Sequence, residues 1–244
     1  MRIAYISLHW ARTLASGVGK KIYRQTEAWK SLGHRVRLFM HSEFTRDLNL
    51  LPSEKFFYPT NKGILQRELG RIRAMKKMLR AVEHYKPDII YLRYGIYVYP
   101  VHRLASIAPV IEEMTTNDVA QHKGLGLPYN LYNHLTRGLL LSNTSGLVCL
   151  SRELMLAPHN AKFKKPTRIV GDGIDIENIA LLPAPQNAQP RIAFIGSPGS
   201  LWQGIEKLVQ LAKEFPDISI HIIGYDQIDG HHPLPGNLYL YGYL

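Results

Sequence analysis

The sequence has 244 residues, 45% of them hydrophobic, and a formal net charge of +11. This excess of positive charge favours an anionic partner such as a nucleotide, a nucleic acid or an anionic membrane surface. The single Cys149 excludes an internal disulfide, and no apolar run approaches the ~20 residues of a membrane span. We therefore expect a cytoplasmic protein, with peripheral attachment to the inner face of the membrane as an option.

The first forty residues predict a strand, a glycine-containing loop, a helix and a second strand. The run RIAYIS predicts a buried strand rather than the core of a signal peptide, because polar residues follow it directly. A helix is expected over residues 18–32, with Val18, Ile22, Trp29 and Leu32 on one face, and Gly33 ends it. HRVRLFM predicts the next strand. Together these elements indicate a βαβ unit of a parallel sheet.

The same alternation continues along the chain. We expect an amphipathic helix over residues 64–85, strands at DIIYLRY and APVIEEM, and a helix over residues 129–141. A strand at GLVCLS, a short helix at RELMLAPH, and a strand or linker at TRIVGDGI follow. The stripe of the 64–85 helix that is expected to face the core consists of Leu65, Leu69, Ile72, Met75, Leu79 and Val82.

The stretch LLPAPQNAQP predicts a domain linker, because it has three prolines and no periodic pattern. After it the strand and helix pattern restarts with RIAFIG, IEKLVQLAKEF, ISIHIIG and NLYLYGYL. We expect an N-terminal α/β domain over residues 1–180, a linker over 181–190 and a second α/β domain over 191–244. The second is short against a common domain of about 100–150 residues. It is therefore expected to be the first part of a longer domain.

The stretch LASGVGKKIYRQ is similar to a phosphate-binding loop but satisfies no strict motif. Lys21 stands where a nucleotide hydrolase needs Ser or Thr, and Ile22 stands where the dinucleotide fingerprint needs its third glycine. Glycines at a strand-to-helix junction still allow a ligand to approach the backbone, and a helix N-terminus attracts anions.

Six blocks in the same order resemble the glycosyltransferases of family 4, also called group 1. They are SGVGKKIYRQTEAWKSLGHRVRLF, KPDIIYLR, GLVCLSRELM, RIVGDGIDIENI, RIAFIGSPGSLWQGIEKLVQLAKEFPDISIHIIG and NLYLYGYL. The resemblance implies a GT-B fold, in which two Rossmann-like parallel-sheet domains face each other across a cleft. It implies that the first domain takes the acceptor and the second takes the nucleotide-sugar. It also implies transfer with retention of anomeric configuration, without a metal or another cofactor.

The resemblance assigns two groups of residues near the ends of the first domain. The glycine loop near the phosphates and sugar of the donor is matched by Ser16, Gly17 and Val18. The block GDGID matches the family's Asn-Gly-Val-Asp hinge, and its candidate residues are Asp172, Gly173 and Asp175.

In the second domain the two cations that hold the donor diphosphate in the family are absent. Ser197 follows Gly196 where Arg is usual, and Gln203 precedes Gly204 where Lys is usual. These four residues remain the candidates at the donor phosphates, and backbone amides or other lysines have to compensate. The family's pair of glutamates lies further on than Leu244, so we expect that this chain alone does not transfer sugar.

Three polar residues near a strand end are candidates for acceptor contact. Glu112 and Glu113 are adjacent, and because side chains alternate along a strand, at most one of them faces the cleft. The alternative is a solvated pair or a helix cap. Asn117 is open to the same two interpretations, since with Asp118 it can cap the next segment.

The 64–85 helix carries a basic face that suits an anionic membrane surface. The membrane-facing candidates are Arg67, Arg71, Arg73 and Lys77. The alternative is a solvated face over an apolar core stripe.

These observations favour a retaining glycosyltransferase of cell-surface polysaccharide or glycolipid biosynthesis, such as lipopolysaccharide assembly, that acts on a glycan or lipid-linked acceptor. The alternative is a shortened, non-catalytic homologue that binds a membrane or a partner. A nucleic-acid partner is not expected, because no recognition motif is present. The eleven histidines show no metal-ligand spacing, so no metal site is expected.

Overall fold

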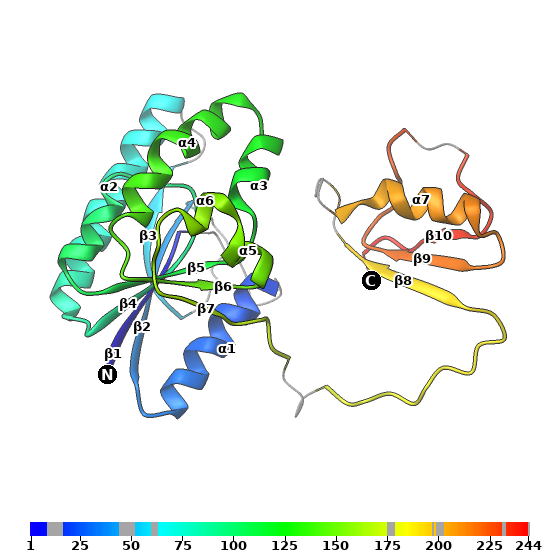
Figure 1. Ribbon diagram of the computed structural model, residues 1–244, viewed down its shortest axis with the longest axis horizontal. Coiled ribbons are helices and arrows are strands. Elements are labelled where there is room, and N and C mark those ends of the chain that lie inside the picture. Colours follow the sequence, from blue (N-terminus) through cyan, green and yellow to red (C-terminus); the bar gives the residue numbers. More distant parts are fainter. Residues whose placement is uncertain are drawn as a thin grey trace. The chain divides into compact units, whose positions relative to one another are not determined.

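Parallel strands joined by helices build the chain (Figure 1). The computed structural model describes residues 1–8, 17–43, 52–59, 63–174, 179–196, 198, 203–230 and 233–243. The chain forms two units, Met1–Gly173 and Ile174–Leu244, and each is described by itself. The residues of the expected linker, 181–190, form neither helix nor strand and are exposed.

The first unit contains a parallel sheet with seven strands among the residues that the structure describes. In chain order the strands are β1 (Arg2–Ser7), β2 (Arg35–Glu43), β3 (Glu54–Tyr58), β4 (Ile89–Arg93), β5 (Val110–Met114), β6 (Gly146–Cys149) and β7 (Thr167–Ile169). Their order in the sheet is β3-β2-β1-β4-β5-β6-β7. The chain therefore builds outward from β1 to β3 and then returns to place β4 on the other side of β1.

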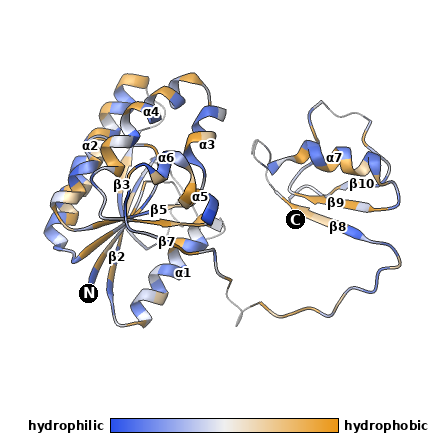
Figure 2. Cartoon of the chain, in the orientation of Figure 1, coloured by the Kyte–Doolittle hydropathy of each residue, from blue (hydrophilic) through white to orange (hydrophobic). Residues whose placement is uncertain are grey.

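Helices cover both faces of this sheet, because strand side chains point alternately to either face. On one face α1 (Gly17–Ser31) places Ile22 against Tyr5 of β1. On the other face α2 (Ile64–Tyr85), η1 (Val101–Ser106) and α4 (Leu127–Leu141) contribute to the core around Ile6, with Met75 of α2 among its members. Figure 2 shows that the strands are mostly hydrophobic, whereas the helices carry both kinds of residue.

Three shorter helices complete the first unit. They are α3 (Asp118–Gly124), α5 (Arg152–Leu156) and α6 (Pro158–Ala161). A small core cluster of Met114, Leu141, Leu147 and Cys149 lies near them, with Leu154 of α5 packed against it. These helices lie beyond the carboxyl ends of β5 and β6 in the chain.

In its described residues, the second unit contains a parallel sheet and one helix. Its described strands are β8 (Arg191–Ile195), β9 (Ser219–Ile223) and β10 (Leu238–Leu240), in the order β10-β9-β8. The helix α7 (Ile205–Glu214) buries Val209 and Ala212 against Ile220 and Ile222 of the central strand β9. Both units are thus the α/β, parallel-sheet type that the sequence predicts.

The expected helices and strands lie close to their predicted positions, with two differences. The edge strand β3, the short η1 and the helix α3 are additional elements. On α2 the predicted core stripe is wrong at its start, since Leu65 and Leu69 are 73% and 44% exposed and burial begins at Ala74. A helix of this length is about 33 Å long, whereas a five-residue strand spans about 17 Å, so its first turns extend beyond the sheet.

One residue that was expected on the apolar face of α1 is also exposed. Leu32, expected on the apolar face, is 71% exposed because the helix has ended at Ser31. Gly33 has a φ of +82°, a left-handed conformation that suits glycine, and so ends the helix as expected. Within the described ranges, none of the helices combines the length and the apolar character needed to cross a membrane.

Candidate functional site

The strand order of the first sheet reverses at β1, between β2 and β4. Ligands of parallel α/β sheets bind outside the carboxyl ends of the strands at such a reversal. The register places Ser7 of β1 level with Arg93 of β4, and Arg93 level with Glu113 of β5. Residues at the carboxyl ends of three adjacent strands therefore meet at the edge where a ligand is expected.

Glu113 is the centre of a charged cluster at this edge. Its Oε1 lies 3.0 Å from Lys21 Nζ of α1, and its Oε2 accepts a hydrogen bond of 3.2 Å from Arg93 Nη1. Lys21 Nζ also lies 2.5 Å from Asp172 Oδ1. Glu113 and Arg93 are buried, whereas the Lys21 side chain is 23% exposed. Among Lys21, Glu113 and Arg93, Lys21 is therefore the residue that solvent or a ligand can reach.

Aromatic side chains pack beneath the cluster on the same face of the sheet. Tyr5 and Tyr91 meet edge to face with ring centroids 5.2 Å apart, and Trp29 of α1 packs against both. The Tyr5 hydroxyl donates to Gln25 Oε1 at 3.1 Å. Burial, and next the charge of Glu113, raise the pKa of Tyr5 well above its usual value. The tyrosines therefore support the cluster as neutral groups.

Of the predicted glycine loop, the structure describes the residues that begin α1. Gly17 is the first residue of the helix and is exposed, Val18 is half-buried, and Ser16 lies outside the described residues. Lys21 follows Gly17 by four residues, which is one helical turn. The first turn of α1 and the charged cluster are thus joined through Lys21.

Gly95 brings two strand ends close together at the reversal. A Cβ on Gly95 would lie 3.0 Å from Leu8 Cβ, so a larger residue would require Leu8 to shift by a few tenths of an ångström.

Glu112 lies on the opposite face of β5 from Glu113. Its side chain is fully buried, and neither carboxylate oxygen has a hydrogen-bond partner among the residues that the structure describes. Burial raises the pKa of Glu112 from 4.5 to about 8, with nearby Arg137 opposing the rise and Asp118 adding to it. Because both glutamates are buried, the solvated alternative expected for this pair is wrong.

A buried polar network lies on the Glu112 side of the sheet. Arg137 of α4 pairs with Asp118 at the start of α3, with Nε at 2.7 Å from Oδ2, and it also donates to Asn160 and to the carbonyl oxygen of His159. Burial alone would raise the pKa of Asp118, but hydrogen bonds from Arg137 and its charge hold that pKa below the usual value. This network fastens α3, α4 and α6 to one another.

Asn117 caps α3. Its side chain accepts a hydrogen bond of 3.1 Å from the backbone N–H of Ala120, as an N-cap residue does. The capping interpretation of Asn117 is therefore confirmed, whereas its contact with an acceptor stays a prediction.

The predicted hinge residues follow β7. Asp172 is paired with Lys21, and its side chain is 59% exposed. Gly173 is exposed and is the last residue of the first unit. Asp175 lies outside the described residues.

Three of the four candidates for donor contact lie in described loops of the second unit. Gly196 donates its N–H to Ile223 O at 3.1 Å, Gly204 precedes α7 with a φ of +67°, and Tyr225 OH donates to Gln203 Oε1 at 3.1 Å. Ser197 lies outside the described residues.

The four basic candidates of α2 divide into two pairs. Arg71 is bonded to Glu68 at 2.8 Å and 3.0 Å with its side chain only 13% exposed, and Arg67 lies 3.7 Å from the same carboxylate. Arg73 and Lys77 instead line a pocket beside β3. The structure thus turns only Arg73 and Lys77 toward an open site. In the part of the chain that is described, no group of three or more His, Cys, Asp or Glu residues could hold a metal ion.

No family model and no curated protein match the sequence. Solved structures match it along its whole length. They include sucrose-phosphate synthase from Thermosynechococcus elongatus (TM-score 0.70, 16% identity, 70% of that chain) and Anabaena HepE in complex with UDP and glucose (0.65, 15%, 70%). The lipopolysaccharide outer core galactosyltransferase WaaB matches with a TM-score of 0.63, 13% identity and 68% of its chain. The chain has the GT-B fold.

At these identities the likeness shows the fold alone. The UDP-GlcNAc 2-epimerase from Neisseria meningitidis also matches the whole chain (TM-score 0.57, 12% identity, 72% of that chain), so the fold is not confined to transferases. From the sequence, Lys21 and Asp118 were named only in the tests for a phosphate loop and a helix cap, and Arg93, Arg137 and the pairing of Asp118 with Arg137 were not predicted. The position of Lys21 one turn after Gly17 was an available signal, whereas the pairing of Asp118 with Arg137 bridges two helices and had none.

Proposed function

We propose that the protein transfers a sugar from a nucleotide-sugar to a glycan or lipid-linked acceptor, with retention of anomeric configuration. The observation that carries this proposal is the Lys21–Glu113–Arg93 cluster at the strand reversal of a GT-B fold. Solved structures with this fold include one in complex with UDP and glucose. We place the protein in the biosynthesis of cell-surface polysaccharide or glycolipid.

The first unit takes the acceptor in this proposal. Glu113 is held between two cations, and its carboxylate oxygens have further lone pairs for an acceptor hydroxyl. Lys21 has three N–H donors, of which the ion pairs with Glu113 and Asp172 occupy two. The third donor and the N-terminus of α1 supply positive charge for the donor phosphates.

The second unit takes the nucleotide. Gly204, directly before α7, has only side-chain atoms of Lys207 and Glu206 near the position of a Cβ, so a phosphate oxygen can approach its backbone. Lys207 lies in the first turn of α7, where its backbone N–H bonds to Gly204 O. We propose that Lys207 and backbone amides replace the two cations expected from the family resemblance, so that no metal ion is required.

Binding of nucleoside diphosphates tests this proposal before turnover is measured. The protein is titrated calorimetrically with UDP, GDP and ADP and with a hexose conjugate of each, in the presence of EDTA. We expect one nucleotide to bind, with its hexose conjugate binding at the same stoichiometry. Release of nucleoside diphosphate with an acceptor, and proton NMR of the product's anomeric coupling, then test transfer and retention.

Two adjacent lysines provide a matched pair of variants. Lys21→Met removes the cation of the cluster and is expected to weaken nucleotide binding about ten-fold, the equivalent of one charge-assisted contact. Lys20→Met removes an exposed charge from the neighbouring position of α1 and is expected to change binding less than two-fold. Equal losses in both variants, or no binding of any nucleotide by the unmodified protein, would contradict the proposal.

A non-catalytic module that binds a membrane or a partner is the second candidate. The pocket beside Arg73 and Lys77 favours it, because that pocket does not depend on the donor unit. Retained binding at this pocket together with a lack of nucleotide binding would select the module.

A further inference from the structure

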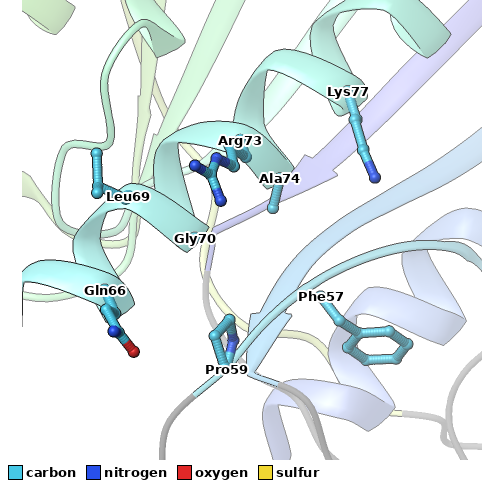
Figure 3. Close-up of a pocket in the computed structure, with 8 residues that line it drawn as sticks. All are labelled: Phe57, Pro59, Gln66, Leu69, Gly70, Arg73, Ala74 and Lys77. Carbon is cyan, nitrogen blue, oxygen red and sulfur yellow. The ribbon is translucent and has the colours of Figure 1, made fainter. Parts of the chain in front are cut away.

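A pocket of about 550 Å³ lies between the end of β3 and the first half of α2 (Figure 3). This volume is within the range of about 300–1,000 Å³ that is typical of small-molecule sites. Phe57 and Pro59 contribute from the strand end, and Leu69, Arg73 and Lys77 contribute from the helix. The pocket therefore combines an apolar surface with two cations.

The two cations have no counterion in the described part of the chain. No ion pair of Arg73 or Lys77 with a described carboxylate is present, both residues are exposed, and the pocket lining contains no acidic residue. The neighbouring Arg71 shows the contrast, since Glu68 neutralises it on the same helix. Figure 3 shows Arg73 and Lys77 projecting from α2 on the side where Phe57 and Pro59 lie.

The apolar part of the pocket continues onto uncovered surface. Leu69 lines the pocket and is 44% exposed, and Ile64 and Leu65 in the first turn of α2 are 78% and 73% exposed. Adjacent exposed apolar residues of this kind mark binding surfaces more often than scattered ones do. An aliphatic chain that enters the pocket would cover this surface.

Gly70 sets the shape of the pocket. A Cβ on Gly70 would lie 2.8 Å from Pro59 Cδ, so only glycine allows α2 to come this close to the end of β3. The approach holds the cations of the helix beside the apolar side chains of the strand end.

The pocket opens at the same edge of the sheet as the strand reversal. Phe57 and Tyr58 end β3, and β3 is two strands away from β1 in the sheet. Tyr58 of β3 pairs with Glu43 of β2, three residues beyond the Met40 that pairs with Ser7 of β1, so β3 ends further along the strand direction than β1. The pocket is lined by α2, which covers the opposite face of the sheet from α1 and Glu113, so it is a site separate from the charged cluster.

We infer that the pocket between β3 and α2 binds a phosphate-bearing amphiphile. Arg73 and Lys77 bind the phosphate, and Phe57, Pro59 and Leu69 contact the aliphatic chain. The identification of this ligand as the acceptor rests on the proposed function, whereas the binding itself does not. The shared chemistry belongs both to a lipid of the membrane and to a separate phosphorylated acceptor.

The probe that tests this inference is dodecyl phosphate, used below its micelle-forming concentration and followed by titration calorimetry. Two comparison ligands separate its parts: dodecyl maltoside has the chain with a neutral head, and inorganic phosphate has the head without a chain. We expect saturable binding of one dodecyl phosphate per chain, and binding at least ten-fold weaker for each comparison ligand. Inorganic phosphate binding as tightly as dodecyl phosphate would overturn the inference.

A matched pair of double variants locates the binding. Arg73→Glu with Lys77→Glu is expected to weaken dodecyl phosphate binding about thirty-fold, because each lost cation accounts for about five-fold. Lys76→Glu with Arg80→Glu makes the same change in charge at exposed positions of α2 outside the pocket, and is expected to leave binding within two-fold. Circular dichroism confirms that both variants fold. Equal weakening in both would overturn the inference, because net charge alone would then account for binding.

Vesicles of phosphatidylcholine with and without phosphatidylglycerol separate the two sources of the ligand. Pelleting with the anionic vesicles that is lost in the Arg73/Lys77 variant supports a membrane lipid. Binding of dodecyl phosphate without pelleting supports a separate phosphorylated acceptor. Nucleotide titration of the same variant is expected to be unchanged, so failure of this inference and failure of the proposed function can be told apart.

Discussion

Two adjacent glutamates at the end of β5 show how the two faces of one sheet differ. Glu113 faces α1 and is paired with Lys21 and Arg93. Glu112 faces the other layer, where it is fully buried beside the Asp118–Arg137 pair and has no hydrogen-bond partner within the described ranges. Alternation along the strand places the two residues on opposite faces, and the layers packed against those faces give them different surroundings.

The difference lies in which charges a ligand can reach. On the α1 side the cluster includes the partly exposed Lys21 and the exposed Asp172, so the charges can change partners when a ligand binds. On the other side Asp118 and Arg137 are nearly inaccessible and saturated with hydrogen bonds. We therefore propose that the charged groups form a binding site on the α1 face, whereas the buried pair on the other face is a structural fastening that holds helices together.

The largest expected effect is the loss of the structural fastening. Arg137→Met leaves the Asp118 carboxylate buried without its partner and should lower the free energy of unfolding by about 3–5 kcal/mol. Urea unfolding followed by circular dichroism measures the change. A loss of less than about 1 kcal/mol, as for an exposed ion pair, would contradict the assignment of this face as structural.

Glu113→Gln is expected to have a smaller effect on stability and an additional effect on binding. It leaves Arg93 buried beside a neutral amide and should lower the free energy of unfolding by about 2 kcal/mol. The same variant should also weaken ligand binding at this edge, measured by titration calorimetry. If Glu113→Gln lowered stability as much as Arg137→Met and left ligand binding unchanged, the two faces would not differ in role.

The fold was largely predictable, because each strand and helix of the sheet carries a local signal. RIAYIS and DIIYLRY are mostly apolar runs, and Gly33 and Pro87 follow the ends of α1 and α2. The edge strand β3 was missed because EKFFY has no alternation and is mostly half-buried. The exposure of Leu65 and Leu69 depends on how far α2 extends beyond the sheet, which no local pattern encodes.

The candidate site was only partly predictable. The position of Glu112 and Glu113 at a strand end follows from the sequence, and their alternation separates the two faces. The sequence does not predict which of the two glutamates pairs with a lysine, because Lys21 and Asp172, which lie together beside Glu113, come from segments far apart in the chain. The sequence also does not predict that Arg71 is paired with Glu68 whereas Arg73 and Lys77 line a pocket, because this depends on where Glu68 and β3 lie.

The raised pKa of Glu112 predicts how the stability of the protein depends on pH. Its pKa is about 8 in the folded protein and 4.5 when unperturbed, so between these pH values the folded state holds a proton that the unfolded state has lost. Stability therefore falls as the pH rises from about 4.5 to about 8, by up to about 1.4 kcal/mol per pH unit. The groups that face Glu112 are Asp118, Arg137 and Tyr94.

Glu112→Gln is expected to remove this contribution. The variant should be more stable than the unmodified protein by about 1–2 kcal/mol at pH 8, and less stable by about 1–3 kcal/mol at pH 5, where the cost of a buried amide without a partner remains. Free energies of unfolding at several pH values measure it. A difference that stays constant from pH 5 to pH 8 would show that Glu112 does not titrate in this range.

The smallest expected effect on stability is that of Lys21→Met. Glu113 keeps its bond to Arg93, and the lost pair with Asp172 is largely exposed, so the free energy of unfolding should fall by about 1 kcal/mol or less. Thermal unfolding compares this variant with Lys20→Met. A loss of several kcal/mol would indicate that Lys21 is part of the structural fastening rather than of a binding site.

Hydrogen exchange with bound ligand tests the central claim, that ligands bind on the α1 side of the β5 edge. The protein is exchanged alone and with UDP-glucose, GDP-mannose and ADP-glucose in turn, and amide protection is read by mass spectrometry. We predict that one donor protects the first turn of α1 and residues 93–95, and leaves α3 and α4 unchanged. Protection of α3 and α4 without protection of α1, or no protection by any of the three, would contradict the claim.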